Sequence, residues 1–585
     1  MKHHERPKTG AFHSMQKSYL CSLLFVFLAT SALGQTYHFA AHGGGSKKEE
    51  LLDFKVDGAE NSYVLVKYDS NVSFGTDSYT NKAKNSVIAK FDRNGNQLMT
   101  KDIPAEGSNA LFGALGVSAN GMVVAASGTK AGTLDGHEVY NGTFIGKLGS
   151  DGSFEWVLQP VHTVDRVRQF LGFRVTAIEV VNNDIYVAAT ANGKITLNGV
   201  TDPGFANDNQ QSALLIKLNA SGSVQWIRNI PTPEVRNHRT IDGGMDHILP
   251  SADGAHIYVA GKVGDGSINP YEVAFVAKFT TDGSFSWVTK TSSSGSDSWG
   301  IAETSDGDLI SGFEVGGPQQ IDFGNGPTLE PSETGWFGAL VRLDANGNVK
   351  TLKYVTDALH TEATNLGAAK LLTLHHLAVS DNDRVILVGE VVGTHQLKNN
   401  LEIASTPGLV GSSPDVAIIV TDLEFDPIEA IANTGSNNEW GRKCVLRSNR
   451  IYFSGEYESF SHPFLGSYAP QFGDFTFVSA GDQDVYVASL STDALPASAP
   501  APSPAPDPTV PALNLSLTRT ADTLTLAWPA DQTNVILEHA SSLAPDSWGA
   551  LDVTPTLENN HWQVTLPIPS SEIDQSGFYQ LRHQE

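Results

Sequence analysis

Residues His256 to Lys290 read HIYVAGKVGDGSINPYEVAFVAKFTTDGSFSWVTK, and this stretch decides the fold. Its segments HIYVAGK, EVAFVAKFT and FSWVTK are rich in β-branched and aromatic residues, and a TDG turn joins the last two. Short runs of this kind, bounded by glycine turns, predict three successive β-strands. Relatives of the unit recur along most of the 585 residues, so we expect an array of one all-β unit.

Seven segments begin such a unit, and each is followed by a second and a third strand. They are LLDFKVDG (51–58), ALGVSANG (114–121), AIEVVNND (177–184), HILPSADG (247–254), GIAETSDG (300–307), HLAVSDND (376–383) and KCVLRSNR (443–450). Six units continue into a fourth strand, whereas the seventh runs into a proline tract after Thr492. The segment TYHFAAHGGG at residues 36–45 occupies the equivalent place, so we expect the N-terminus to supply the missing strand.

A ring of four-stranded blades that shares one blade between its two ends leaves no sheet edge open. The sequence therefore predicts an all-β fold, with a seven-bladed β-propeller over residues 35–493 closed by the N-terminal strand. The alternative, a linear solenoid, needs polar capping units at both ends, and neither end has one. Residues 257–287 resemble the bacterial β-propeller repeat (SBBP-like) with its YVxG and AFVAKLDxxGNxxW pattern. That resemblance implies a secreted protein and implies no particular activity.

The first 34 residues are typical of a secretory signal: a basic segment, the apolar run Leu20 to Ala29, and a small-residue site before Gln35. A start at Met15 instead of Met1 would give a shorter basic segment. No other stretch approaches the roughly 20 apolar residues of a membrane span. We therefore expect a secreted or cell-envelope location.

The chain is acidic, with a formal net charge of −26, and removal of the signal with its charge of +3 leaves −29. Such a charge disfavours nucleic acid and anionic membranes as partners. Its two cysteines are Cys21, within the signal, and Cys444. A mature chain with one thiol has no internal disulfide and no cysteine-built metal site.

The composition changes after residue 493. Residues 494–511 are rich in proline and alanine and predict a stiff linker. Residues 512–585 contain short alternating segments that predict a small β-sandwich. The sequence LTLAWPA…VILEHASSLAPDSW…GFYQLR resembles fibronectin-III-like or Ig-like modules, and a surface-attachment or sorting module is the alternative.

Two recurrent motifs resemble ligand-binding sequences, but a purely structural role is the favoured interpretation of both. The turns DRNGN (92–96), SDGS (150–153), TDGS (281–284) and DANGN (344–348) resemble the start of calcium loops, yet none has the glutamate that completes one. Plain hairpin turns are the favoured interpretation, so we expect no cofactor, with calcium as the alternative. LNASGSVQW (218–226) resembles the tryptophan-docking repeat of quinone-dependent dehydrogenases. That resemblance implies that Trp156, Trp226 and Trp287 lock neighbouring blades together.

The candidate ligand-binding residues lie at the start of the innermost strands. SGSDSWG (294–300) and SNNEWG (436–441) place Trp299 and Trp440 at one equivalent position, beside Asp297 and Glu439. Exposed rings next to carboxylates would stack on a sugar, whereas the plainer interpretation has both rings fill space between blades. Three further candidates, in the loops entering the fourth and sixth blades, are Asp246, His247 and His376. No complete catalytic or metal-binding motif is present.

The sequence thus favours an exported, non-catalytic and monomeric scaffold, whose mouth loops bind a glycan or a protein and whose tail attaches it to a surface. The alternative is a secreted hydrolase or lyase with its site in the propeller mouth. A third hypothesis is a cell-envelope assembly protein that grips a protein partner.

Overall fold

The computed structural model describes residues 36–491 and 515–583 except for short gaps. These gaps are 81–84, 104–112, 119–120, 130, 141, 163–171, 203–210, 230–243, 265–271, 292–294, 317–319, 325, 331–335, 361–370, 409–410, 434–437, 459, 463–465, 469, 521–522, 531–534, 541–548, 552, 559–560 and 568–577. The expected signal and linker lie outside the described residues. The chain divides into two compact units, Met1–Ala497 and Ser498–Glu585.

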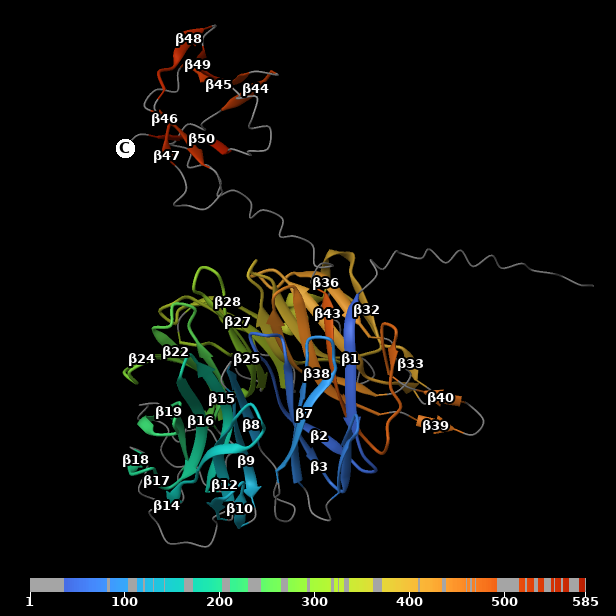
Figure 1. The fold of residues 1–585 in the computed structure, drawn as a ribbon. Helices are drawn as coiled ribbons and strands as arrows, with labels where there is room; N and C mark the ends of the chain where they lie inside the picture. The colour runs from blue at the N-terminus through green and yellow to red at the C-terminus, as the bar shows by residue number, and fades with distance from the viewer. Residues whose placement is uncertain are drawn as a thin grey trace, which may run out of the picture. The chain divides into compact units, whose positions relative to one another are not determined.

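The first unit is almost entirely β and propeller-like (Figure 1). In its described part, six antiparallel four-stranded sheets each take their strands in chain order. They are β2 (Glu49–Val56), β3 (Ser62–Tyr68), β6 (Asn85–Phe91), β7 (Gln97–Ile103); β8 (Gly113–Ser118), β9 (Gly121–Thr129), β12 (Gly142–Leu148), β13 (Phe154–Leu158); β15 (Phe173–Val181), β16 (Asp184–Asn192), β19 (Gln211–Asn219), β20 (Val224–Asn229); β21 (Gly244–Pro250), β22 (His256–Gly264), β23 (Glu272–Thr280), β24 (Phe285–Lys290); β25 (Gly295–Glu303), β26 (Leu309–Gly316), β27 (Trp336–Leu343), β28 (Val349–Tyr354); and β29 (Leu371–Val379), β30 (Val385–Val392), β35 (Asp415–Thr421), β36 (Pro427–Ala432).

A further sheet combines the two ends of this unit, and we call it the split sheet. Its first four strands are β37 (Glu439–Arg447), β38 (Arg450–Tyr457), β43 (Asp484–Ser491) and β1 (Tyr37–Gly44), and the hairpin of β4 (Asn71–Phe74) and β5 (Asp77–Thr80) extends it beyond β1. Strand β1 pairs antiparallel with β43, so that Ala40 faces Ala488 and His42 faces Tyr486. The expected pairing of the N-terminal segment with residues 484–490 is present.

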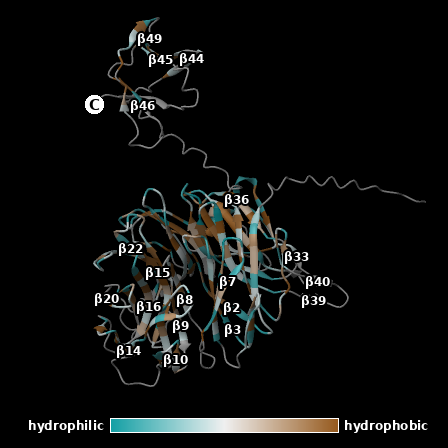
Figure 2. Ribbon diagram, viewed as in Figure 1, coloured by the Kyte–Doolittle hydropathy of each residue, from teal (hydrophilic) through white to brown (hydrophobic). Residues whose placement is uncertain are grey.

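The sheets pack on one another in chain order through their first strands. Contacts join β2 to β8, β8 to β15, β15 to β21, β21 to β25, β25 to β29, β29 to β37, and β37 to β2. A separate apolar cluster fills each of these interfaces; for example, Ile386 and Val388 of β30 pack with Phe453 and Tyr486 of the split sheet. Second strands such as β3, of which all seven residues are buried, are therefore covered on both faces. Figure 2 shows hydrophobic residues gathered in these strands.

The outer strands dock onto the turns of the next sheet. The rings of Trp156, Trp226 and Trp287 lie against Gly222, Gly283 and Gly347, where an added Cβ would come within 2.8–2.9 Å of a ring atom. Each of these glycines has a positive φ, which hairpin turns of this type require. Met99 and Phe39 contact Gly152 and Gly95 in the same way. The predicted blade-locking role of the three tryptophans is confirmed.

The turns that resemble calcium loops are closed by their own side chains. Asp92 Oδ1 accepts the backbone N–H groups of Asn94 and Asn96 at 2.8 and 2.9 Å, and Asp344 Oδ1 does the same for Asn346 and Asn348. These carboxylates serve the hairpin geometry, as the plain-turn interpretation predicts.

Small hairpins and two short helices decorate the sheets. They are β4 (Asn71–Phe74) with β5 (Asp77–Thr80), β10 (Gly132–Leu134) with β11 (His137–Val139), β14 (Val161–His162) with β17 (Ile195–Leu197) and β18 (Val200–Thr201), β31 (Thr394–Gln396) with β32 (Glu402–Ala404), β33 (Pro407–Gly408) with β34 (Gly411–Ser412), β39 (Phe460–His462) with β40 (Gly466–Tyr468), β41 (Gln471–Phe472) with β42 (Phe475–Thr476), α1 (Val355–Leu359) and the 3-10 turn Lys398–Asn400.

The second unit contains two antiparallel sheets. One has the order β44 (Ser516–Arg519), β45 (Thr523–Pro529), β49 (His561–Pro567), β48 (Thr556–Glu558), and the other has β47 (Gly549–Ala550), β46 (Val535–Ala540), β50 (Phe578–His583). Leu526, Trp528 and Val564 of the first sheet pack with Leu537 of the second. This arrangement matches the predicted small β-sandwich.

Candidate functional site

The innermost strands carry a β-bulge at a recurrent place. The register shifts before Asp53 in β2, Ala177 in β15, His247 in β21, Gly300 in β25, His376 in β29 and Lys443 in β37. A bulge re-aims the side chain that follows it. The structure thereby gives the predicted residues His247 and His376 equivalent positions in two different sheets.

Three of the side chains that follow a bulge contact backbone groups of the next sheet. Asp53 Oδ2 accepts the backbone N–H of Leu115 at 2.8 Å. His247 Nε2 lies 3.0 Å from the carbonyl oxygen of Ser298, and His376 Nδ1 lies 3.4 Å from the backbone nitrogen of Cys444. The innermost strand of each sheet has one unpaired edge, whose backbone groups need partners. The two histidines therefore connect neighbouring sheets.

Both histidines are held neutral. Burial first, and then the nearby Lys443 ammonium, lowers the pKa of His247 to about 3 and that of His376 well below its ordinary value. Their rings lie edge to face with centroids 5.6 Å apart. An imidazole that stays uncharged throughout the physiological range and is bonded to the backbone is poorly suited to proton transfer at neutral pH.

Ion pairs accompany the histidines, and sequence reasoning missed them. Lys443 Nζ lies 3.6 Å from Asp53 Oδ1, and Lys55 pairs with Glu179 across the innermost strands of two sheets that are not adjacent. The first pair joins the split sheet to the β2 sheet. Its residues follow the bulges, and only knowledge of the bulge positions would have singled them out.

The predicted rim residues do not form one exposed site. Trp299 is 6 % exposed, and its ring contacts Gly312 and Gly338 inside the interface between the β25 and β29 sheets. The expectation of an exposed sugar platform is therefore wrong for Trp299, and the space-filling interpretation is confirmed. Glu439 is fully buried, which excludes it from the rim as well.

The remaining predicted residues lie apart from these. Trp440 is half-buried, with the guanidinium carbon of Arg442 5.9 Å from its ring centroid. Asp246 is half-buried on β21. Asp297 belongs to β25, but its side chain lies outside the described part. Ligand binding by Trp440, Asp246 and Asp297 stays a prediction.

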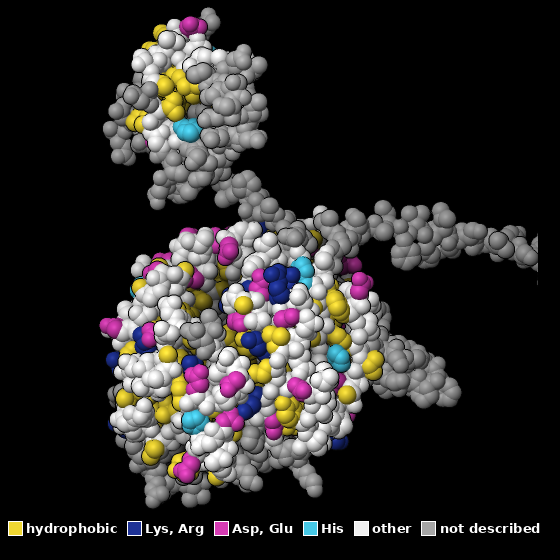
Figure 3. All heavy atoms as spheres, viewed as in Figure 1, with side chains coloured by type: hydrophobic (Ala, Val, Ile, Leu, Met, Phe, Trp, Pro, Cys, Tyr) yellow, Lys and Arg dark blue, Asp and Glu magenta, His cyan; other side chains and the backbone are white. Residues whose placement is uncertain are grey.

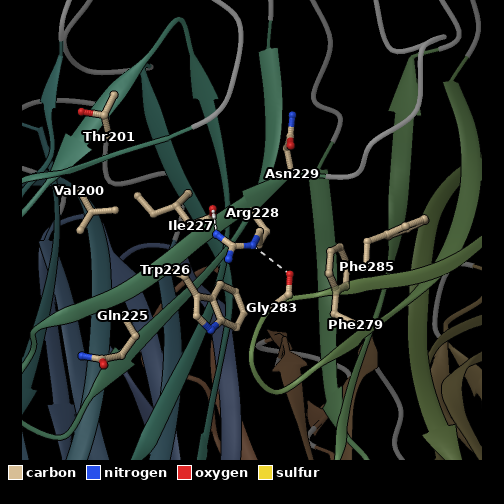
Figure 4. A pocket seen from close by; sticks show the side chains of 10 residues that line it. All are labelled: Val200, Thr201, Gln225, Trp226, Ile227, Arg228, Asn229, Phe279, Gly283 and Phe285. Carbon is tan, nitrogen blue, oxygen red and sulfur yellow. Dashed lines mark hydrogen bonds between the residues drawn. The ribbon is translucent and has the colours of Figure 1, made fainter.

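An open cavity of about 540 Å³ lies between the outer strands of two neighbouring sheets, and we call it the β20–β24 groove (Figure 4). This volume falls in the range of small-ligand sites. Its lining comes from β18, β20, β23, β24 and the turn before β24: Val200, Thr201, Gln225, Trp226, Ile227, Arg228, Asn229, Phe279, Gly283 and Phe285. Sequence reasoning missed the groove because it depends on the spacing of two outer strands and an inserted hairpin.

Arg228 is the one charged side chain in this lining. Its guanidinium carbon lies 5.5 Å from the Trp226 ring centroid, and its Nε and Nη1 donate to the carbonyl oxygens of Gly283 and Ile227 at 2.9 and 3.0 Å. Among the described residues, no carboxylate forms an ion pair with it. Phe285, which is 38 % exposed, lies across the groove from Arg228 (Figure 4).

Within the described ranges, no cluster of three or more histidine, cysteine or acidic residues could hold a metal ion. The described helices include none that is long and apolar enough to cross a membrane. Figure 3 shows acidic side chains spread over the visible face of the first unit, in keeping with the negative net charge.

Comparison with protein families gave no match, and comparison with curated proteins gave none either. Solved structures that resemble the chain include puromycin hydrolase, with a TM-score of 0.39, 12 % identity, and coverage of 83 % of this chain and 59 % of that one. A polysaccharide lyase gives a TM-score of 0.38, 10 % identity, and coverage of 78 % and 98 %. The apocarotenoid oxygenase of Synechocystis gives 0.34, 9 %, 77 % and 92 %. The chain thus spans about three fifths of the length of puromycin hydrolase.

Proposed function

We propose that this protein is an exported, non-catalytic binding protein whose first unit is a seven-bladed β-propeller closed by β1. The closed propeller is supported by the four-stranded sheets, by the pairing of β1 with β43, and by first-strand contacts that lead from β2 through β37 back to β2. Export is supported by the signal-like first 34 residues. The second unit attaches the protein to a cell surface in this proposal.

The observation that carries a binding role is the composition of the β20–β24 groove. Its lining offers aromatic rings, two amides, a hydroxyl and a guanidinium, but no carboxylate, imidazole, thiol or amine. Hydrolysis and elimination need an acid or a base within hydrogen-bond reach of the substrate. These ten residues supply recognition without such a group, which favours binding over turnover.

The ligand class that fits this groove is an acidic glycan. Phe285 presents an exposed aromatic surface of the kind that stacks on sugar rings, and Gln225 and Asn229 offer amide donors and acceptors for hydroxyl groups. Arg228 keeps a positive charge that no described carboxylate neutralises, and guanidinium groups bind carboxylates or sulfates strongly. Acidic side chains that lie more than a Debye length (about 8 Å) from the groove are largely screened in physiological salt, so the net negative charge opposes such a ligand only weakly.

A glycan array with the full mature chain tests this proposal. We expect binding to uronate-containing or sulfated glycans, and weaker binding to their neutral counterparts. Phe285→Ala should weaken binding about tenfold or more, since a stacked aromatic anchor contributes more than 1 kcal/mol. Tyr140→Ala is the matched control, because Tyr140 is an exposed aromatic residue outside the groove. An array without acidic ligands, or equal losses in both variants, would exclude the groove as the site.

The hydrolase or lyase alternative makes a different prediction. If polysaccharide turnover were found and His247→Gln or His376→Asn abolished it, these two histidines would be catalytic and the binding proposal would be wrong. We expect no such turnover, because both imidazoles are neutral and bonded to the backbone of the next sheet.

A further inference from the structure

Four buried carboxyl groups form two pairs, one on each side of the split sheet. Glu49 of β2 pairs with Asp484 of β43, and Glu439 of β37 pairs with Asp415 of β35. All four side chains are fully buried. Buried acids of this kind are rare unless something compensates their charge.

The two pairs are built in the same way. In each pair, the glutamate is the first residue of an innermost strand and the aspartate is the first residue of the third strand of the preceding sheet. The backbone N–H of Glu49 donates to Gln483 O at 2.7 Å, and that of Glu439 donates to Pro414 O at 2.8 Å. Each acceptor directly precedes the paired aspartate. The main chain therefore brings the acids together at both interfaces.

Each of the four acids has at least one buried oxygen that accepts from no described donor. Backbone N–H groups of Gly45, Ala480 and Thr406 donate to Glu49 Oε2, Asp484 Oδ2 and Asp415 Oδ2 at 2.8, 2.7 and 2.6 Å. Among the described residues, none donates to the other oxygens of these three acids, or to either oxygen of Glu439. Two ionised carboxylates so placed repel each other strongly. A proton or another cation shared within each pair would remove this repulsion.

A proton suits each pair better than a metal ion. Three of the four acids accept a backbone N–H group, whose positive end repels cations, and no third acidic, histidine or cysteine side chain completes a metal site in the described ranges. We infer that each pair binds one shared proton, and that the two pairs form a proton-operated clasp holding the split sheet to its neighbours. This inference concerns the stability of the fold and does not depend on the proposed glycan site.

The charged groups near the two acid pairs favour the protonated form more than they oppose it. Asp69 raises the pKa of Glu49, and Glu458 raises that of Glu439. His42 lies near Asp484 and opposes the rise there, while its Nδ1 lies 2.8 Å from the hydroxyl oxygen of Tyr457. The hydroxyl of Tyr457 lies 3.4 Å from Asp484 Oδ2 of the first pair, and that of Tyr486 donates to Trp440 O at 3.0 Å. Both hydroxyls stay protonated, because burial raises the pKa of both tyrosines.

The sign of the pH dependence follows from these shifts. Burial, then the partner acid, raises the pKa of Glu49 to about 9 and that of Glu439 to about 10, whereas unfolded glutamate titrates near about 4.3. Between these limits the folded state binds more protons than the unfolded state, so stability falls as pH rises. The contribution of the clasp to stability is full below about pH 4 and is lost progressively toward about pH 9–10, whereas the protons themselves stay bound at neutral pH.

The double variant Glu49→Gln with Glu439→Gln, made in the full chain, tests the clasp. Each amide can donate an N–H to the partner carboxylate without a shared proton. We expect the thermal midpoint of the wild type to fall between about pH 5 and about pH 9, and that of the variant to fall less and to exceed the wild type at the alkaline end. Hydrogen-exchange protection in β1 and β37, taken relative to the base-catalysed intrinsic exchange rate, should fall with pH in the wild type and stay level in the variant. Glu155→Gln is the surface control for a single Glu→Gln change, because Glu155 is exposed and pairs with Lys147.

An unchanged pH slope in the double variant would overturn the clasp. A rise of the wild-type midpoint at alkaline pH on adding Ca²⁺ alone would also overturn it, since a cation would then occupy the pairs. If the variant does not fold, infrared spectra of the wild type decide the question. A protonated carboxyl band that is present at neutral pH and disappears toward about pH 10 supports the clasp, and its absence at neutral pH refutes it.

Discussion

At the scale of single residues, polar side chains on the innermost strands form hydrogen bonds with the unpaired backbone groups of the neighbouring sheet. His247, His376 and Asp53 follow bulges and bond to backbone groups of the next innermost strand. These residue types usually suggest catalysis or metal binding when they are met in a sequence. Here the same polarity satisfies an unpaired strand edge, which explains why polar residues occur at the centre of an otherwise apolar packing.

His247→Gln tests this role through its pH dependence. The amide nitrogen of glutamine can take the place of Nε2 and still donate to Ser298 O, but it does not titrate. Because the folded pKa of His247 is lowered to about 3, its contribution to stability is full above about pH 6.5 and is lost as pH falls. We expect the wild type to lose about 1–2 kcal/mol more than the variant between about pH 7 and about pH 5 in urea unfolding. Equal losses would show that the histidine is charged in the folded state.

At the scale of elements, the sequence predicted strands well and bulges not at all. The segments SYVLVKY and QLMTKDI coincide with β3 and β7, because β-branched and aromatic runs between glycine turns report strands directly. A bulge inserts one residue without changing that composition, so the alignment of Asp53, His247 and Lys443 could not be predicted. Glu439 is predicted at the rim because it stands beside Trp440 at the start of an innermost strand, and its buried partner Asp415 is 24 residues away in the sequence.

Gly283→Ala measures the docking of one sheet on the next. An added Cβ would lie 2.9 Å from the Trp226 ring, and φ is +86°, so a side chain meets both a clash and backbone strain. Gly254→Ala is the matched control, because φ is +68° there but no atom lies within 4 Å of the added Cβ. We expect the control to lose about 1 kcal/mol of unfolding free energy and Gly283→Ala to lose about 2–4 kcal/mol. If denaturant unfolding showed similar losses of unfolding free energy in both variants, the Trp226 ring would move aside at little cost and would contribute little to blade packing.

At the scale of the whole molecule, strand β1 and the second unit contribute unequally to the stability of the first unit. Strand β1 contributes Phe39 to the apolar cluster between the split sheet and the β2 sheet, and it covers the outer edge of β43. The second unit has an apolar core of its own, which includes Leu526, Trp528 and Leu537. A propeller shares its stability around the ring, so the strand that joins the ends should matter more than a module with a separate core.

Two truncations compare these ends. A chain that begins at residue 45 lacks β1, which exposes the edge of β43 and removes Phe39 from its cluster. We expect it to aggregate, or to unfold at a midpoint lower by about 3–5 °C or more, because loss of a buried aromatic side chain alone costs about 3–5 kcal/mol and a unit of this size loses about 1 °C per kcal/mol. A chain that ends at Ala497 lacks the second unit and should keep the midpoint of the first transition. Adding a peptide of residues 36–44 to the first truncation should restore part of the lost stability, since the edge of β43 is then paired again. If removal of β1 left the thermal midpoint unchanged, β1 would contribute little to the stability of the first unit. The proposal that β1 closes the propeller would then be wrong.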